Sequence, residues 1–139
     1  MIYFKTIRWK NLLSTGNQFT EIQLDKSSTT LIVGDNGSGK STILDALCFG
    51  LFNKPFRKIN RPQLINSVND GGLLVEIEFD IGSRYYKIRR GIKKNIFEIY
   101  VNYQLLFVLP SVDILQLLLL AHKSLFFVQY ILFLVFLLH

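Results

Sequence analysis

Cysteine and histidine are scarce in this chain of 139 residues, which holds one cysteine and two histidines. A single cysteine excludes an internal disulfide, and we interpret Cys48 as a buried structural thiol in a reducing compartment. Neither His122 nor His139 has a metal-ligating neighbour at a useful spacing, so no metal centre is predicted from them. The N-terminus also lacks the basic stretch, apolar core and cleavage site of a secretory signal peptide.

Glycine is absent and charged residues are scarce toward the end of the sequence. All nine glycines lie at or before Gly91. Residues 105–139 carry only Asp113 and Lys123 as acidic and basic residues, and 26 of these 35 residues are hydrophobic. We therefore expect a body over residues 1–104 and an atypical hydrophobic tail over residues 105–139. The net charge of +6 falls entirely in the body, which suggests a polyanionic partner.

Three interpretations compete for the tail. Its longest charge-free run, Ser124–Leu138, is shorter than the ~20 residues of a membrane span, and an upstream extension would place Lys123 in hydrocarbon. A core helix is the second interpretation, but leucine and phenylalanine fall on all sides without an amphipathic stripe. We favour the third, an out-of-frame or truncated sequence, which a reading of the nucleotide sequence in three frames tests. No membrane association is expected.

Residues 34–42 read GDNGSGKST, a complete phosphate-binding loop of the form G-x-x-x-x-G-K-[ST]. Glycines let successive backbone N–H groups curl around phosphate oxygens, and Lys40 adds a positive charge toward the outer phosphates. The Ser41 hydroxyl suits Mg²⁺, and a helix that begins at this point adds the positive end of its dipole. The loop alone does not distinguish ATP from GTP.

The sequence around the loop fits this motif. The apolar, β-branched run 29–33 predicts a buried strand before it, and residues 41–52 place apolar side chains at helical spacing after it. Asp45 is interpreted as a helix-surface charge rather than a catalytic base. The order of strand, loop and helix indicates an α/β phosphate-loop NTPase fold.

The rest of the body predicts further strands. Residues 2–9 and 19–24 are expected as strands, and residues 53–72 as a loop-rich connection with one short helical turn. Residues 73–81 alternate apolar and polar side chains and begin a three-stranded antiparallel meander over 73–103. The acidic members of this strand are interpreted as its solvated face: Glu76, Glu78 and Asp80.

Basic residues gather in two clusters, and tyrosines interleave with the second. The first cluster comprises Lys54, Arg57, Lys58 and Arg61. The second comprises Arg84, Lys87, Arg89, Arg90, Lys93 and Lys94. Contacts to a DNA backbone and solvated strand and turn residues are equally compatible with the second cluster. No recognition-helix motif is visible, so we expect contacts with DNA phosphates rather than with bases.

Several segments together resemble the N-terminal half of an SMC-type ABC ATPase head. They are KNLLSTG at 10–16, the loop at 34–42 and LDALCFGLF at 44–52. Residues 53–57, 63–67, 85–91 and 97–99 are similar to the large subunit of the SbcC-like recombination nuclease in its T-even-like phage form. The resemblance covers residues 1 to about 103 and implies an incomplete head domain.

The resemblance implies ATP as the nucleotide and Mg²⁺ as its metal ion, held through Ser41. It also implies a second ATPase head that pairs in the presence of ATP, a metal-dependent nuclease subunit and DNA as partners, in the bacterial or phage-infected cytoplasm. Ser14 would lie near the nucleotide, next to Leu13 where many relatives carry arginine. The residues implied to bind nucleotide are Gly34, Asn36, Gly37, Ser38, Gly39, Lys40, Ser41 and Thr42.

The sequence does not show the family's glutamine loop, coiled coil, signature motif or aspartate-glutamate pair. Because phosphoryl transfer to water needs a positioned water and a base, we expect the chain alone to hydrolyse ATP negligibly. Other interpretations remain: a RecF/RecN-like repair ATPase, a membrane-transporter ATPase subunit with an apolar tail, and a nucleotide-binding fragment without catalysis.

Overall fold

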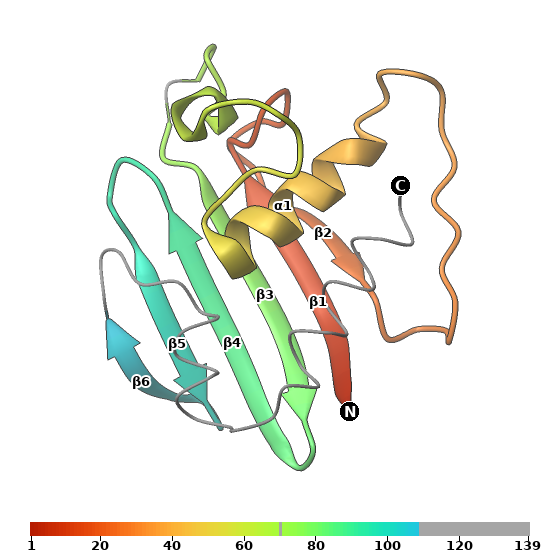
Figure 1. The fold of residues 1–139 in the computed structure, drawn as a ribbon, viewed down its shortest axis with the longest axis vertical. Helices are drawn as coiled ribbons and strands as arrows, with labels where there is room; N and C mark the ends of the chain where they lie inside the picture. The colour runs from red at the N-terminus through yellow and green to blue at the C-terminus, as the bar shows by residue number, and fades with distance from the viewer. Residues whose placement is uncertain (70, 109–139) are drawn as a thin grey trace.

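A single antiparallel sheet with one helix on it makes up the fold in a computed structural model, which describes residues 1–69 and 71–108 (Figure 1). The strands stand in the order β2-β1-β3-β4-β5-β6, so that segments far apart in sequence become neighbours at β1 and β3. The strands are β1 Ile2–Lys10, β2 Thr20–Gln23, β3 Leu74–Ile81, β4 Arg84–Gly91, β5 Phe97–Val101 and β6 Gln104–Val108.

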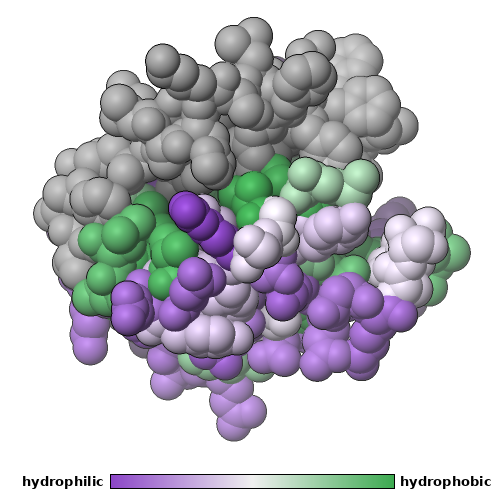
Figure 2. Space-filling view, turned by 90° about the horizontal axis from the view of Figure 1, so that it is seen from below, coloured by the Kyte–Doolittle hydropathy of each residue, from purple (hydrophilic) through white to green (hydrophobic). Residues whose placement is uncertain are grey.

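The meander follows the alternation of its sequence. Val75, Ile77 and Phe79 are almost fully buried on one face of β3, and β4 pairs with β3 from Leu74↔Gly91 to Ile81↔Arg84. The predicted strands at 2–9 and 19–24 form β1 and β2 of the same sheet. Viewed from the lower end of the sheet, hydrophilic side chains gather along one side of the described molecule, with apolar side chains above them (Figure 2).

The sheet continues beyond the expected end of the meander at residue 103. Strand β6 pairs with β5 from Val101↔Gln104 to Glu98↔Val108. Residues 104–108 therefore belong to the sheet, although the composition places most of them in the tail. The remaining tail interpretations concern residues 109–139, which lie outside the described residues. In the described part of the chain, no helix has the length and apolar character that crossing a membrane requires.

Helix α1 (Lys40–Phe52) crosses one face of the sheet (Figure 1). Apolar residues at helical spacing, including Ile43, Ala46 and Phe49, are buried in the common core. Gly50 permits the closest approach, because a Cβ atom there would lie 2.5 Å from Ile77 Cδ1 on β3. Asn53, in a left-handed conformation, ends the helix and donates its N–H to the Phe49 carbonyl.

The predicted strand at 29–33 is wrong for this structure. The segment has no regular secondary structure, and Leu31, Ile32 and Val33 expose 84%, 43% and 79% of their surface. A buried strand needs neighbours that pair with its backbone and cover its side chains. Within residues 1–69 and 71–108, no strand pairs with this run, since β2 occupies the edge of the sheet beside β1.

The segment after β1 is held against the 3₁₀ turn η1 (Arg61–Leu64), the short helical turn that the sequence predicts. Leu12 forms an isolated bridge with Ile65, and the Leu13 N–H donates to the Leu64 carbonyl at 2.7 Å. The buried side chain of Asn66 donates to the Leu13 carbonyl at 2.7 Å. These bonds fix the position of the adjacent Ser14.

Candidate nucleotide-binding site

The phosphate-binding loop has the backbone that its glycines allow. Gly37 and Gly39 have φ angles of 84° and 92°, a region that side-chain-bearing residues rarely adopt. The Lys40 ammonium folds back inside the loop and donates to the carbonyls of Gly34 and Asp35, the latter at 2.8 Å. The lysine charge therefore lies within the curve of the loop, where the motif places phosphate.

Helix α1 begins at the loop with its first N–H groups uncapped by side chains. Gly39 is the N-cap residue, no side chain caps the helix, and its first turn holds no acidic residue. N–H groups without a side-chain cap, together with the positive end of the helix dipole, suit an anion. Ser41 is exposed in this first turn, whereas Thr42 is buried and donates its backbone N–H to the Gly39 carbonyl at 3.0 Å. Of these two neighbouring hydroxyl residues, Ser41 is therefore the one that is open to solvent.

An open pocket of about 340 Å³ connects the loop with two other parts of the chain. Ser14 lines this pocket beside Leu13. Arg57, from the connection after α1, completes its edge as a residue that the motif does not include. The lining residues are Leu13, Ser14, Asn36, Gly37, Gly39, Lys40, Ser41, Thr42 and Arg57. Two of the residues implied to bind nucleotide, Gly34 and Ser38, belong to the loop but not to this lining.

Asp45 holds Arg57 at the pocket. The interpretation of Asp45 as a surface charge is wrong, because its side chain is fully buried. Its Oδ1 atom accepts the backbone N–H groups of Phe56 and Arg57 at 3.0 and 3.1 Å, and Oδ2 accepts the Arg57 Nε–H at 2.6 Å. The carboxylate thus fastens the connection to α1 and orients the guanidinium. Partners eleven and twelve residues further along the chain explain this burial, and local helical spacing did not indicate them.

Cys48 lies on the same helix as Asp45 and is half-buried. Burial, and next the negative charge of Asp45, raise the pKa of the thiol to about 11. The side chain is therefore a neutral thiol at physiological pH, which agrees with a structural role.

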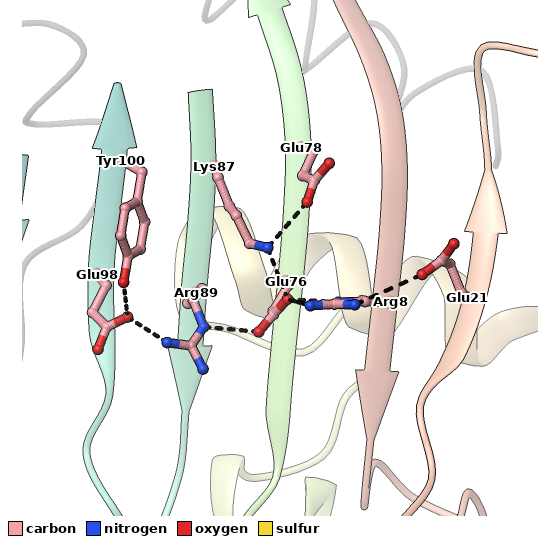
Figure 3. Close-up of polar contacts among 8 residues, drawn as sticks. All are labelled: Arg8, Glu21, Glu76, Glu78, Lys87, Arg89, Glu98 and Tyr100. Atoms are coloured by element: carbon pink, nitrogen blue, oxygen red, sulfur yellow. Dashed lines mark hydrogen bonds and ion pairs between the residues drawn. The ribbon is translucent and has the colours of Figure 1, made fainter. Parts of the chain in front are cut away.

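A network of charged residues covers the sheet face opposite α1 (Figure 3). Glu76 at its centre is only 3% exposed, which corrects the expectation of a solvated acidic face. Its carboxylate accepts hydrogen bonds from Arg8 Nε at 2.6 Å and Arg89 Nε at 2.8 Å, and Lys87 Nζ lies at 3.2 Å. Burial alone would raise the pKa of Glu76, but the hydrogen bonds from Arg89 and Arg8 lower it below its ordinary value.

We expect Glu76→Gln to lower the free energy of unfolding by about 2 kcal/mol, because the cations around this buried position lose their common counter-ion. The loss falls below that of a fully buried pair, since the Arg8 and Arg89 side chains are about one third exposed. Because the folded pKa is depressed, the contribution is fully present above pH 4.5 and is lost progressively as the pH falls from there through the folded pKa.

Urea titrations at neutral pH and at about pH 3.5 measure this effect. The matched control is Glu21→Gln, an exposed carboxylate 3.9 Å from Arg8, which should change stability by less than about 0.5 kcal/mol. Equal effects of the two substitutions, or a Glu76→Gln effect that is no smaller at pH 3.5 than at neutral pH, would contradict the role of Glu76.

The predicted DNA-contact residues separate into three groups. Arg90 is 2% exposed, donates its Nε–H to the Gly50 carbonyl at 3.1 Å and lies over the Phe97 ring. A side chain buried in this way does not reach DNA, so Arg90 is no longer a candidate contact residue. Lys87 and Arg89 belong to the network around Glu76. The exposed members are Arg84, Lys93 and Lys94.

Comparisons with known proteins agree with this geometry. A sequence model of the family described as "AAA domain" matches residues 6–113. Exonuclease subunit 2 of Enterobacteria phage T4 is 52% identical over 96 residues, which are 69% of this chain and 17% of that protein. The DNA double-strand break repair Rad50 ATPase of Sulfolobus acidocaldarius is 36% identical over 89 residues, or 63% of this chain and 10% of that protein.

Solved structures of related ATPases are similar to this chain in fold. A structure described under "Structural biochemistry of ATP-driven dimerization and DNA stimulated activation of SMC ATPases" matches with a TM-score of 0.60 and 28% identity, over 76% of this chain and 72% of that one. The RecF-ATP recombination mediator matches with a TM-score of 0.57 and 25% identity, over 76% and 28%. The chain spans about a sixth of the phage relative's length. The chain belongs to the AAA domain family, and it is similar to Rad50 and SMC ATPases.

Proposed function

We propose that this chain is the ATP-binding part of an ATPase subunit in a DNA double-strand-break repair nuclease complex. The observation that carries the proposal is the loop at 34–42, with the Lys40 ammonium inside its curve and a pocket that extends to Ser14 and Arg57. The similarity to exonuclease subunit 2 of phage T4 and to Rad50 ATPases supports the assignment to repair.

Different groups in the pocket bind different parts of the nucleotide. Backbone N–H groups at the start of α1 and the Lys40 ammonium bind phosphate oxygens, and the exposed Ser41 hydroxyl would hold Mg²⁺. That ion would neutralise charge on the phosphates. A titration of the chain with Mg-ATP and Mg-GTP tests the proposal: we expect saturable binding of one ATP per chain, and no saturable binding of either nucleotide would reject it.

Arg57 should contribute to this binding, although the motif does not include it. We expect Arg57→Ala to weaken ATP binding about tenfold, because a guanidinium oriented by Asp45 donates charge-assisted hydrogen bonds to phosphate. Isothermal titration calorimetry with ATP and ADP measures the loss and shows which phosphates depend on it. Arg84→Ala, which removes an exposed arginine outside the pocket, is the matched control. Equal affinities of the Arg57 and Arg84 variants would contradict this role.

Hydrolysis requires groups beyond this pocket, because the described residues that line it include no carboxylate. Phosphoryl transfer to water needs an oriented nucleophile as well as bound phosphates. We therefore expect purified chain to bind ATP with negligible turnover in a phosphate-release assay. Robust turnover that Lys40→Ala abolishes would contradict this expectation.

The proposed complex contains further partners. We propose ATP-driven pairing with a second head because ATP-driven dimerization is described for the similar SMC ATPases, and a nuclease subunit because the phage relative is named as an exonuclease subunit. DNA is the proposed substrate, and the cytoplasm of a bacterium or a phage-infected cell the proposed location. Arg84, Lys93 and Lys94 are the exposed residues of the basic cluster that we propose for contacts with its phosphates.

A further inference from the structure

A strained tyrosine stands at the turn between β5 and β6. Val101 pairs with Gln104, so Asn102 and Tyr103 form a two-residue hairpin loop, with φ angles of 48° and 67°. Such a turn favours Asn-Gly because both central residues need positive φ. Asn102 fits, and its side-chain Oδ1 accepts the Tyr85 N–H at 3.1 Å. Tyr103 occupies the position that favours glycine.

Core packing does not account for Tyr103, which is 79% exposed. Its ring stacks on Tyr85, with 4.5 Å between the ring centroids and 17° between the planes. A bulky residue with positive φ is unusual, and such strain persists where a side chain serves another purpose. The turn thus presents an aromatic ring to solvent at a conformational cost.

The surroundings of this ring form a shallow pocket of about 440 Å³. Its lining combines three tyrosines, two lysines and one glutamate: Tyr85, Tyr100, Tyr103, Lys5, Lys87 and Glu78. A fourth tyrosine, Tyr3, is 59% exposed and stands in the same cross-strand row, because Tyr3 and Tyr85 both pair with Asp80. Aromatic rings therefore gather at one end of the sheet face opposite α1.

The lysines of the pocket are largely balanced by acids. Lys5 Nζ lies 2.8 Å from Asp80, and Lys87 Nζ lies 3.0 Å from Glu78. A site for a polyanion alone would show unpaired charge. Stacked, exposed rings with a small number of cations instead suit the flat faces of nucleobases, with adjacent phosphates near the lysines.

We propose that Tyr103 and Tyr85 form a stacking platform for unpaired bases of single-stranded nucleic acid. The inference rests on the proposed function, since it names the form of nucleic acid that this face of the ATPase would bind. It also adds base stacking to the backbone contacts expected of the basic cluster. DNA and RNA share the chemistry, and the experiment separates them.

Fluorescence anisotropy of labelled oligothymidylate tests the platform. We expect Tyr103→Gly to weaken binding about fivefold or more, and Tyr103→Phe to retain it. Glycine suits the positive φ, so Tyr103→Gly should not lower the thermal midpoint. Phe19→Ala, which removes a 40% exposed aromatic ring outside the pocket, is the matched control and should leave binding unchanged.

Further oligomers and a salt titration show which part of the nucleic acid the platform contacts. An abasic oligomer of equal charge should bind weakly to the wild type and equally weakly to Tyr103→Gly, and duplex should show no dependence on Tyr103. Oligouridylate distinguishes RNA from DNA. The two lysines near phosphate should contribute about −1.4 to the slope of log affinity against log salt, in addition to the contribution of the basic cluster.

Three results would overturn the platform: no binding of oligothymidylate, unchanged affinity in Tyr103→Gly, or a loss that is the same for abasic and intact oligomers. These titrations contain no ATP, and Tyr103→Gly should leave the affinity for Mg-ATP unchanged, because Tyr103 does not line the pocket at the loop. Failure of ATP binding and failure of the platform are therefore distinguishable.

Discussion

Lys40→Ala is expected to weaken ATP binding about 100-fold, because the variant loses a charge-assisted hydrogen bond to phosphate. Among the described residues that line the pocket, Lys40 carries the one ammonium group. It already lies inside the loop, against the carbonyls of Gly34 and Asp35. Backbone N–H groups remain in the variant, so residual binding should persist. Calorimetric titration with Mg-ATP measures the loss.

The variant should fold normally, since Lys40 contacts only exposed carbonyls of its own loop among the described residues. Lys54→Ala is the matched control, because Lys54 is exposed and outside the pocket. A loss of less than about threefold in Lys40→Ala, or an equal loss in Lys54→Ala, would show that the loop does not bind phosphate through this lysine.

Asp45→Ala is expected to lower the free energy of unfolding by about 3 kcal/mol. The buried carboxylate accepts two backbone N–H groups and the Arg57 guanidinium, and alanine replaces none of these bonds. The connection after α1 should loosen, and Arg57 should leave its place at the pocket. Urea unfolding measures the first effect, and ATP titration the second, which should equal that of Arg57→Ala.

Asp45→Asn separates the contribution of the negative charge from that of the hydrogen-bond acceptor. Its amide oxygen can still accept the backbone N–H groups of Phe56 and Arg57, so the stability loss should be about half that of alanine. The ion pair contributes less than a buried pair because the Arg57 side chain is 40% exposed. Unchanged stability in both variants would contradict the role of Asp45.

The local features of the fold could be predicted from sequence. The glycines at 37 and 39 and the helical spacing after them predicted loop and helix, since both depend on neighbouring residues. The alternation at 73–81 and the turn at Gly82 predicted the β3–β4 hairpin for the same reason. The expectation that Ser14 lies near the nucleotide rested on the family resemblance. Its position at the pocket depends on the contacts that its neighbour Leu13 makes with the distant η1 segment.

The remaining features depend on distant partners. The alternation at 73–81 shows which face of the strand Glu76 occupies, and that face was expected to be solvated. It does not show that Arg8, 68 residues away, contacts Glu76 from the neighbouring strand β1. Arg57 looked like part of a basic surface because its contact with buried Asp45 was not visible in the pattern. The run at 29–33 has the composition of a strand, but pairing decides whether a strand forms, and composition does not report it.

Hydrogen–deuterium exchange of the chain with and without Mg-ATP tests the central claim most directly, because it reports on the amides of the loop and of the first turn of α1. We expect ATP to slow exchange at residues 37–42 and around Arg57, and Lys40→Ala to abolish the change at the same ATP concentration. Unchanged exchange at 37–42 under saturating ATP, or protection confined to other segments, would contradict nucleotide binding at this loop.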